Sequence, residues 1–211
     1  MRRLLAPLAA ALLLGSVPTV AAAERSAPSN PALDSLVVAE CSFARMSLEQ
    51  GVRDAFLHWT APDGVIFHPL ASNAREVWSA RGRVKATLTW SPVFAEISAA
   101  GDLGFTTGPW MLQPDDTARA PGFGHYVSVW QRQGDGSWRV AVDIGISHAR
   151  PARGVGMDEA TPGPMHRAYR SDGALPDLMA LDLAWSEDAR QRGAVAAFAR
   201  RAARDVRFCR D

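Results

Sequence analysis

The spacing of apolar residues predicts two helices at the start of the folded part of the chain. Asn30 followed by Pro31 is a typical helix start, because asparagine caps free backbone amides and proline suits the first helical turn. We expect this helix to run to about Met46. The stretch Ser-Leu-Glu-Gln at 47–50 has the form of a capping box, which predicts a second helix that ends near Trp59.

The second predicted helix has an apolar face, and shorter elements follow it. Val52 and Phe56 recur at helical spacing with the final tryptophan, so this face is expected to pack on a sheet. Pro-Asp-Gly at 62–64 predicts a turn. The stretch VIFHP at 65–69 then predicts a short strand, and residues 75–81 predict a short helix.

From residue 85 onward the pattern becomes that of β-strands. Gly-Asp-Gly at 134–136 divides the last two strand-like runs and is a strong hairpin signal. Pro92 predicts a bulge or bend in the first run, and Gly108-Pro109 predicts another in the second. Because helices precede a series of antiparallel strands, the predicted fold class is α+β. The four runs are KATLTWSPVFAEISAAG, LGFTTGPWML, GHYVSVWQRQ and SWRVAVDIGIS.

The first 23 residues have the composition of a signal peptide. Arg2 and Arg3 form a positive start, residues 4–20 form a broken apolar core, and alanines at 21–23 offer a cleavage site. We therefore expect an exported protein, periplasmic or secreted, with no stable membrane span after cleavage. Loss of the two arginines changes the net charge from +1 to about −1, which argues against non-specific nucleic-acid binding. Residues 24–31 are expected to be a linker.

The cysteines and histidines show no ligand spacing typical of a metal site. Cys41 lies in a predicted helix and Cys209 lies near the C-terminus, and nothing in the sequence brings them together. No CxxC or HExxH motif occurs. The sequence therefore predicts neither a disulfide, a metal nor a cofactor.

A Gly- and Pro-rich stretch at 150–175 is predicted to be a linker, and the segment after it repeats the start of the domain. The repeat has an offset of 142 residues, and we expect 176–211 to form the helical start of a second copy. Either this partial copy packs on the first domain or on a partner, or the chain is a shortened form of a two-domain protein, which we favour. The matched pairs include Leu36 with Leu178, Glu40 with Asp182, Phe43 with Trp185, Gly51 with Gly193 and Phe56 with Phe198.

The order of these segments resembles a known family. Two helices lead into DGVIFHP, REVWSARG follows, and then come GDLGFTTGPW and GHYVSVWQRQGDGSWRVAVDIG. This is similar to the SnoaL-like / DUF4440 branch of the NTF2-like superfamily, which includes ketosteroid isomerase. The resemblance implies an NTF2-like domain over 32–149, in which a curved antiparallel sheet wraps around the helices and leaves an apolar pocket. It implies little about chemistry, because the superfamily includes enzymes, binding proteins and assembly modules.

The last predicted strand carries the first candidates for chemistry. Its even-numbered row, from Trp138 through Val142 to Ile146, is apolar and is expected to face the helices, so Asp143 should point outward unless a bulge intervenes. His148 ends the apolar row, where it could move protons at the rim of the pocket or be solvated. His125 begins the preceding strand and could pair with Asp143, although a register shift of one residue would reverse the faces.

The remaining candidates are a histidine and a set of aromatic residues. His68 follows the first short strand, where the resemblance implies that it borders the pocket; the alternative is a surface residue beside Pro69. Aromatic side chains could line the pocket or could simply pack in the core. This set comprises Trp78, Trp90, Phe105, Trp110, Tyr126 and Trp130.

Three functions remain open at this point. The first is an exported domain that binds a small apolar or amphipathic molecule in its cone. The second is an isomerase- or hydratase-type enzyme in which a histidine or Asp143 moves protons beside a polarised carbonyl. The third is a non-catalytic module that forms a homodimer through the outer face of the sheet. The sequence leaves open which of the three applies, and whether the protein is an enzyme.

Overall fold

The computed structural model describes residues 30–67, 69–150, 178–203 and 206. The predicted signal peptide, nearly all of both predicted linkers, and Cys209 lie outside these ranges. Within them, no helix has both the length and the apolar composition needed to cross a membrane.

The first helix begins as the sequence predicts but ends later. In α1 (Pro31–Gln50) the side chain of Asn30 accepts hydrogen bonds from the amides of Ala32 and Leu33. The predicted capping box at 47–50 is wrong, because the helix continues through it and Ser47 is a buried residue within the helix. The helix stops at Gly51, whose φ of 94° suits glycine and few other residues.

A short helix and two strands follow directly. The bounds are α2 (Val52–Trp59), β1 (Thr60–Phe67), β2 (Ala71–Asn73) and α3 (Ala74–Ala80). The turn predicted at 62–64 lies inside β1, at a place where the pairing of β1 with β7 is irregular. The short helix predicted at 75–81 corresponds to α3, whose start is capped by the side chain of Asn73.

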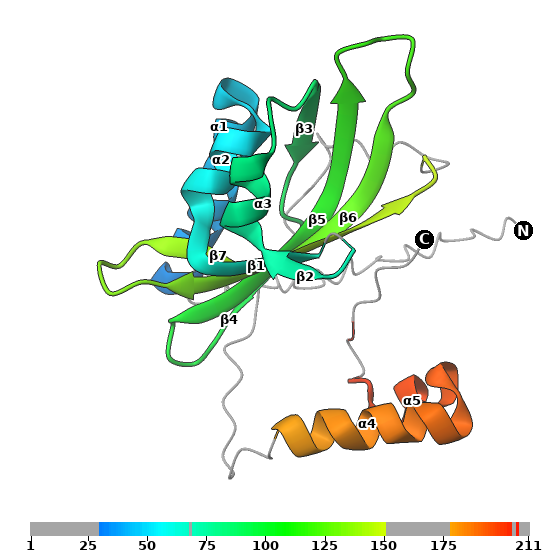
Figure 1. Cartoon of the computed structure of the whole chain (residues 1–211). Helices are drawn as coiled ribbons and strands as arrows, with labels where there is room; N and C mark the ends of the chain where they lie inside the picture. The colour runs from blue at the N-terminus through cyan, green and yellow to red at the C-terminus, as the bar shows by residue number, and fades with distance from the viewer. Residues whose placement is uncertain (1–29, 68, 151–177, 204–205, 207–211) are drawn as a thin grey trace, which may run out of the picture.

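The seven strands form one mixed sheet, and α1, α2 and α3 lie together on one side of it (Figure 1). The strand order is β2-β1-β7-β6-β5-β3, with β4 also paired to β5. The predicted α+β class and curved sheet are confirmed, with one difference: β1 runs parallel to β7 instead of antiparallel. The later strands are β3 (Ala86–Trp90), β4 (Phe94–Ile97), β5 (Leu103–Pro114), β6 (Gly122–Arg132) and β7 (Trp138–His148).

A bulge in β7 decides which residues face the helices. Trp130 of β6 pairs with Val140 of β7, but the next residue back along β6, Val129, pairs with Val142, so β7 carries one extra residue. Before the bulge the buried residues are Trp138 and Val140; beyond it the faces are exchanged. The expectation that Val142 and Ile146 face the helices is therefore wrong.

The predicted irregularities in the earlier strands meet different outcomes. Pro92 lies between β3 and β4, so the bend expected there is present. At Gly108-Pro109, where a bulge or bend was expected, there is no bulge toward β6, because β5 pairs with β6 without interruption through these residues. Gly108 has another role: a side chain there would meet the Ser91 carbonyl oxygen, so glycine lets the two backbones approach closely.

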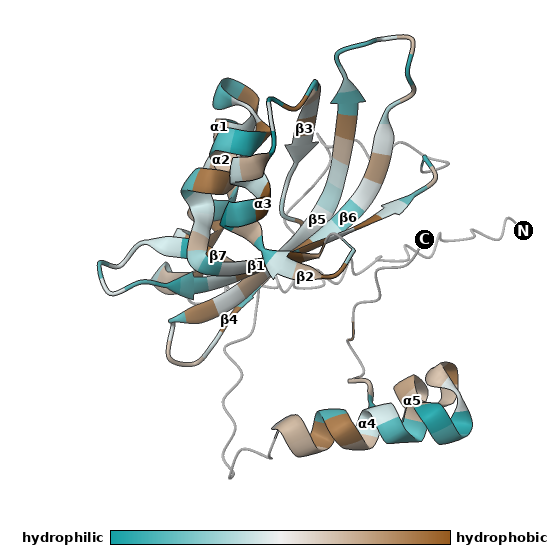
Figure 2. Ribbon diagram, viewed as in Figure 1, coloured by the Kyte–Doolittle hydropathy of each residue, from teal (hydrophilic) through white to brown (hydrophobic). Residues whose placement is uncertain are grey.

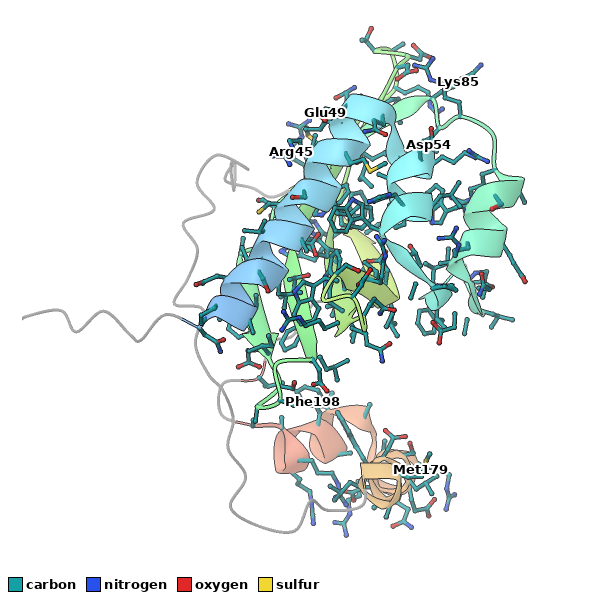
Figure 3. All side chains as sticks on the ribbon, turned by 90° about the vertical axis from the view of Figure 1, so that its left-hand side faces the viewer. Arg45, Glu49, Asp54, Lys85, Met179 and Phe198 are labelled. Carbon is teal, nitrogen blue, oxygen red and sulfur yellow. The ribbon has the colours of Figure 1, made fainter. Side chains whose placement is uncertain are left out.

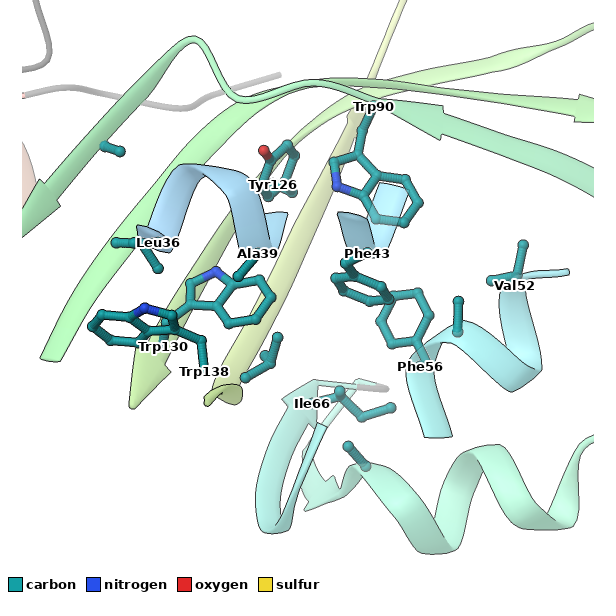
Figure 4. Packing of buried hydrophobic residues seen from close by; sticks show 14 of the residues in the cluster. Leu36, Ala39, Phe43, Val52, Phe56, Ile66, Trp90, Tyr126, Trp130 and Trp138 are labelled. Carbon is teal, nitrogen blue, oxygen red and sulfur yellow. The ribbon is translucent and has the colours of Figure 1, made fainter. Parts of the chain in front are cut away.

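The core lies between the helices and the hollow face of the sheet. Phe43 of α1 is at its centre, with ring centroids 4.8 Å from Phe56 and 4.9 Å from Trp90, both in edge-to-face contact (Figure 4). Toward the narrow end, Trp130 and Trp138 are almost completely buried beside Leu36. Along β6 the core-facing residues, among them Tyr126, Ser128 and Trp130, alternate with the outward-facing Val127 and Val129, and Figure 2 shows the hydropathy along the strands.

The C-terminal helices reproduce the geometry of α1 and α2. Adding 142 to the bounds of α2 gives those of α5 (Ala194–Arg201), and the end of α4 (Leu178–Arg192) corresponds to that of α1. Gly193 separates them with a φ of 84°, as Gly51 does. The ring centroids of Trp185 and Phe198 lie 5.6 Å apart, and those of the corresponding Phe43 and Phe56 lie 4.8 Å apart.

Much of the apolar surface of this helical pair is exposed. Met179, Leu183 and Val195 are 68%, 62% and 79% exposed. Ala197, which corresponds to Ala55, is fully buried. Figure 3 shows Met179 on α4 and Phe198 on α5. That 176–211 begins a second NTF2-like domain stays a prediction.

Candidate ligand-binding cavity

A cavity of about 430 Å³ opens between the helices and the wide end of the sheet. Its volume falls within the range typical of small-molecule sites. Most of its wall is aromatic or aliphatic, and its polar side chains are few: Arg81, Tyr126, Ser128 and Asp143. The apolar lining comprises Phe43, Val52, Phe56, Trp78, Val84, Leu88, Trp90, Trp110 and Leu112, with Gly145 completing it.

Glycines in two strands make room for one wall of the cavity. The indole of Trp110 lies across β6 and β7, and its Nε1 donates to the carbonyl oxygen of His125 at 3.2 Å. A Cβ atom on Gly124 would lie 2.3 Å from the Trp110 ring and 1.9 Å from the Ile146 carbonyl oxygen. A larger residue at this position would therefore displace the tryptophan that forms the wall.

Asp143 points into the cavity and not away from it. The bulge in β7 moves it to the hollow face, where its Oδ1 accepts a hydrogen bond of 2.6 Å from the Ser128 hydroxyl. Burial raises the pKa of Asp143 from 3.8 to about 6, and the bond from Ser128 offsets part of that effect. The expectation that Asp143 faces outward is wrong, since the intervening bulge is present.

Tyr126 lies two residues from Ser128 on β6 and lines the same cavity. Its hydroxyl is buried and makes no geometrically defined hydrogen bond among the described residues; it lies near the Thr106 hydroxyl, which donates to Glu40. Burial raises its pKa well above the ordinary value, the negative charges of Glu40 and Asp143 raise it further, and the Thr106 hydroxyl lowers it slightly. Tyr126 therefore stays a neutral hydrogen-bond donor at physiological pH.

Glu40 is a buried carboxyl group that the sequence analysis did not single out as a site residue. It lies on α1 with 0% of its surface exposed and accepts hydrogen bonds from Trp90 Nε1 at 2.5 Å, Thr106 Oγ1 at 2.5 Å and Trp130 Nε1 at 3.0 Å. Burial raises its pKa from 4.5 to about 7; the three bonds lower it, and the charge of Asp143 raises it.

The two carboxyl groups stand at the ends of one polar row across the sheet. Thr106, Ser128 and Asp143 are direct neighbours on β5, β6 and β7, and Glu40 contacts the row from α1 at Thr106. Two carboxylates coupled in this way resist being ionised together. A signal for Glu40 existed in the sequence, because it recurs with Leu36 and Phe43 on one helical face.

The two histidine candidates among the described residues, His125 and His148, lie away from the cavity. His125 and His148 occupy the outer face of the sheet, where their ring nitrogens Nδ1 and Nε2 are 2.9 Å apart. His125 therefore pairs with His148, and the predicted His125–Asp143 pair does not form. Burial lowers the pKa of His125, and the neighbouring His148 lowers it further. His68 lies outside the described residues.

The predicted aromatic set divides into three groups. Trp78, Trp90, Trp110 and Tyr126 line the cavity. Trp130 is part of the core below it, where it donates to Glu40. Phe105 is on the other side of the sheet, with its ring centroid 5.7 Å from that of Phe94.

A smaller pocket of about 130 Å³ also borders Asp143. It adds Ile66 and Phe67 of β1 to a lining that it shares with the main cavity, including Trp78 and Arg81. Within the described ranges, no cluster of three histidine, cysteine or carboxylate side chains is arranged to hold a metal ion.

Several solved structures are similar to this chain. No family model and no curated protein matches the chain. It is similar to a solved ketosteroid isomerase-like protein from Erwinia carotovora atroseptica, at 14% identity over 58% of this chain and 100% of that one, with a TM-score of 0.45.

Two other solved structures show the same likeness. One is an NTF2-like superfamily protein from Salmonella enterica, at 15% identity over 60% of this chain and 97% of that one (TM-score 0.44). The other is an NTF2-like protein of unknown function from Pseudomonas putida, at 21% identity over 56% and 87% (TM-score 0.44). The likeness is confined to the fold, so the chemistry of the cavity depends on this chain's own residues. The SnoaL-like / DUF4440 branch stays a prediction.

Proposed function

We propose that this chain is an exported NTF2-like domain of the SnoaL-like / DUF4440 type that binds a small, largely apolar molecule in its cone. The observation that carries the proposal is a cavity of about 430 Å³ with aromatic walls and a few polar side chains at one place. Such a lining gains free energy when an apolar ligand displaces water, and the polar groups orient the ligand.

The polar groups suit a ligand that carries one oxygen atom among apolar surroundings. The Tyr126 hydroxyl can donate a hydrogen bond, and a buried hydroxyl without a partner costs about 1–3 kcal/mol that a ligand oxygen would recover. The Asp143 oxygen that Ser128 does not contact can accept one. An alcohol or enol within an apolar frame satisfies both groups, and a ketone satisfies Tyr126.

Binding can be tested with the neutral fluorescent probe N-phenyl-1-naphthylamine. We expect saturable fluorescence enhancement and a higher melting temperature, because a ligand that binds only the folded state stabilises it. Trp110→Ala removes part of the wall and should weaken binding, whereas Phe105→Ala on the opposite face should not. An unchanged melting temperature at saturating probe would contradict the proposal.

A second candidate, favoured by the position of Asp143, is proton transfer beside a carbonyl group. In this reaction the Asp143 carboxylate takes a proton from a carbon next to the carbonyl. The electron pair of the C–H bond moves to form the enolate, whose oxygen accepts a hydrogen bond from Tyr126; the proton then returns to another carbon. A carboxyl group with a pKa near 6 in an apolar site is suited to such a role near neutral pH.

The proton-transfer candidate is tested by exchange of deuterium from solvent into a panel of cyclic enones, followed by NMR. Asp143→Asn should abolish catalysed exchange, and His125→Gln and His148→Gln should leave it unchanged, because both histidines lie on the outer face. Exchange that survives in Asp143→Asn would reject Asp143 as the base.

The outer face of the sheet supports a homodimer as a further proposal. Neighbouring residues on this face are apolar in successive rows, for example Phe105, Val129 and Val142, and Ile144 remains 40% exposed. A surface of this kind is typical of subunit contacts. Light scattering should give a dimer mass that Ile144→Lys reduces to a monomer; a monomer at high concentration would oppose the proposal.

A further inference from the structure

Arg81 is the cationic side chain in the lining of the main cavity. It follows the last residue of α3, and its guanidinium carbon lies 4.7 Å from the centroid of the Trp78 ring. Trp78 is itself a wall of the cavity. Arg81 also borders the small pocket beside Asp143 and the polar groove outside, so it stands where the three openings meet.

The backbone holds this position firmly. The Arg81 carbonyl oxygen accepts a hydrogen bond of 2.8 Å from Nε of Arg53, whose Nη1 also bonds to Asp54 at 2.9 Å. These contacts tie the end of α3 to α2. Stacking on Trp78 also orients the guanidinium, and a planar group placed in this way loses little freedom when it binds an anion.

The cavity lining carries side chains of both charges. In the lining that the structure describes, Arg81 supplies the positive charge, while the carboxyl group of Asp143 occupies the floor beside Ser128. The groups that can charge around Asp143 are Glu40 from α1, Tyr126 from β6 and Arg81 from the end of α3.

We propose that the ligand carries an anionic group that Arg81 binds, while its opposite, neutral end reaches Tyr126 and Asp143. This inference rests on the proposed function, because it assumes a ligand in the cavity. A carboxylate, sulfonate or phosphate at this place would form charge-assisted bonds with the guanidinium, which a neutral ligand cannot form.

The charge on the floor fixes the orientation. An anion placed beside Asp143 would be repelled by its carboxylate, whereas at Arg81 it is attracted. The ligand class is therefore an amphipathic organic anion: an apolar, preferably flat frame that suits the aromatic walls, with one acidic substituent at the mouth. Beyond the mouth, the polar groove is lined by side chains of both charges. The positive ones are Arg53 and Arg83, and the negative ones are Glu49, Asp54 and Asp115.

Two related probes separate this inference from the function on which it rests. One is 8-anilinonaphthalene-1-sulfonate, which is anionic; the other is neutral N-phenyl-1-naphthylamine, which has the same aromatic frame. We expect the wild-type protein to bind both, each probe to displace the other, and the sulfonate to bind more tightly. Raising the salt concentration should weaken the binding of the sulfonate and leave that of the neutral probe unchanged.

The variant Arg81→Gln should weaken sulfonate binding by about tenfold or more and leave the neutral probe within about twofold. Arg83→Gln is the matched control, because Arg83 is two residues away and borders the polar groove but not the main cavity. It should leave both probes within about twofold. Arg81→Lys keeps the charge without the planar fork and should show an intermediate loss, which provides a readout if Arg81→Gln does not fold.

The outcomes are distinguishable. If neither probe binds the wild-type protein, the proposed binding function fails. If the neutral probe binds but Arg81→Gln weakens the binding of both probes equally, the anionic ligand is rejected and the proposed binding function is retained. The same conclusion follows if Arg83→Gln weakens sulfonate binding as much as Arg81→Gln does. If the sulfonate binds without displacing the neutral probe, it occupies another surface, and the assignment of the anion to Arg81 is again rejected.

Discussion

Replacing Glu40 by glutamine should destabilise the protein at acidic pH and stabilise it at alkaline pH. The folded protein raises the pKa of Glu40 from 4.5 to about 7. A carboxyl group whose pKa is raised by folding stabilises the protein fully below its unfolded pKa, and that stability is lost as the pH rises through the folded pKa. In the wild-type protein the loss therefore occurs between about pH 4.5 and pH 7.

The magnitude follows from the shift. Each pKa unit corresponds to about 1.4 kcal/mol, so ionisation of Glu40 lowers the free energy of unfolding by roughly 3 kcal/mol above pH 7. Glutamine keeps one oxygen acceptor, but Trp90 and Trp130 donate to different oxygens of Glu40, so the NH2 group of glutamine faces one of the two donors, at a cost of about 1 kcal/mol. The variant should thus be about 1 kcal/mol less stable at pH 4.5 and about 2 kcal/mol more stable at pH 8.

Urea unfolding followed by tryptophan fluorescence between pH 4.5 and 8.5 measures this difference. An increase of about 2 kcal/mol should raise the melting temperature at pH 8 by roughly 8 °C. The matched control is Glu49→Gln, since Glu49 is exposed on the same helix. The difference in free energy of unfolding between the wild-type protein and Glu40→Gln could instead be the same at every pH. In that case the three hydrogen-bond donors fully stabilise the ionised carboxylate, and Glu40 is not the source of the pH dependence.

Three further changes test other parts of the fold. Asp143→Asn should remove any step near pH 6 from ligand-binding and exchange profiles and raise the free energy of unfolding at pH 8 by about 2 kcal/mol, because burial raises the pKa of Asp143; an unchanged profile would refute the assignment. Gly124→Ala should lower the free energy of unfolding in urea by roughly 2–3 kcal/mol, because the alanine Cβ would overlap the Trp110 indole. It should also change the near-ultraviolet circular dichroism of Trp110. An unchanged free energy of unfolding would mean that the cavity wall rearranges at no cost. As the pH drops from 7 to 5, His125 should oppose the stability gained from the buried carboxyl groups, because folding lowers its pKa and its neutral form must charge. His148→Gln should reduce that opposition and so enlarge the rise in melting temperature from pH 7 to pH 5; an identical rise would contradict the pairing.

The sequence predicted well the features that depend on local chemistry. The helix start at Asn30 follows from the geometry of a capping side chain, and the turn at 134–136 follows from the conformations open to glycine. The repeat at an offset of 142 also appeared in the residue types alone, including the glycines at 51 and 193 that break both helical pairs. These features involve residues close in sequence, so no long-range contact is needed to produce them.

Other local signals were overruled by packing. The capping-box sequence at 47–50 is compatible with a helix start, yet the helix continues because Ser47 is buried against the sheet, where its hydroxyl contacts the Leu88 carbonyl oxygen at 3.4 Å. Gly108-Pro109 suggested a bulge, but the strand remains regular there and glycine instead admits the Ser91 backbone. In both places a distant segment decides the outcome.

The sequence by itself determined the α+β class and the repeated helical pair. Only the tertiary structure decided which face of β7 carries the candidate chemistry. One extra residue between Val140 and Val142 turns Asp143 toward Ser128, because successive strand residues alternate between faces and a bulge exchanges them. The burial of Glu40 beneath two tryptophans from different strands likewise arises only when segments 50 and 90 residues apart come together.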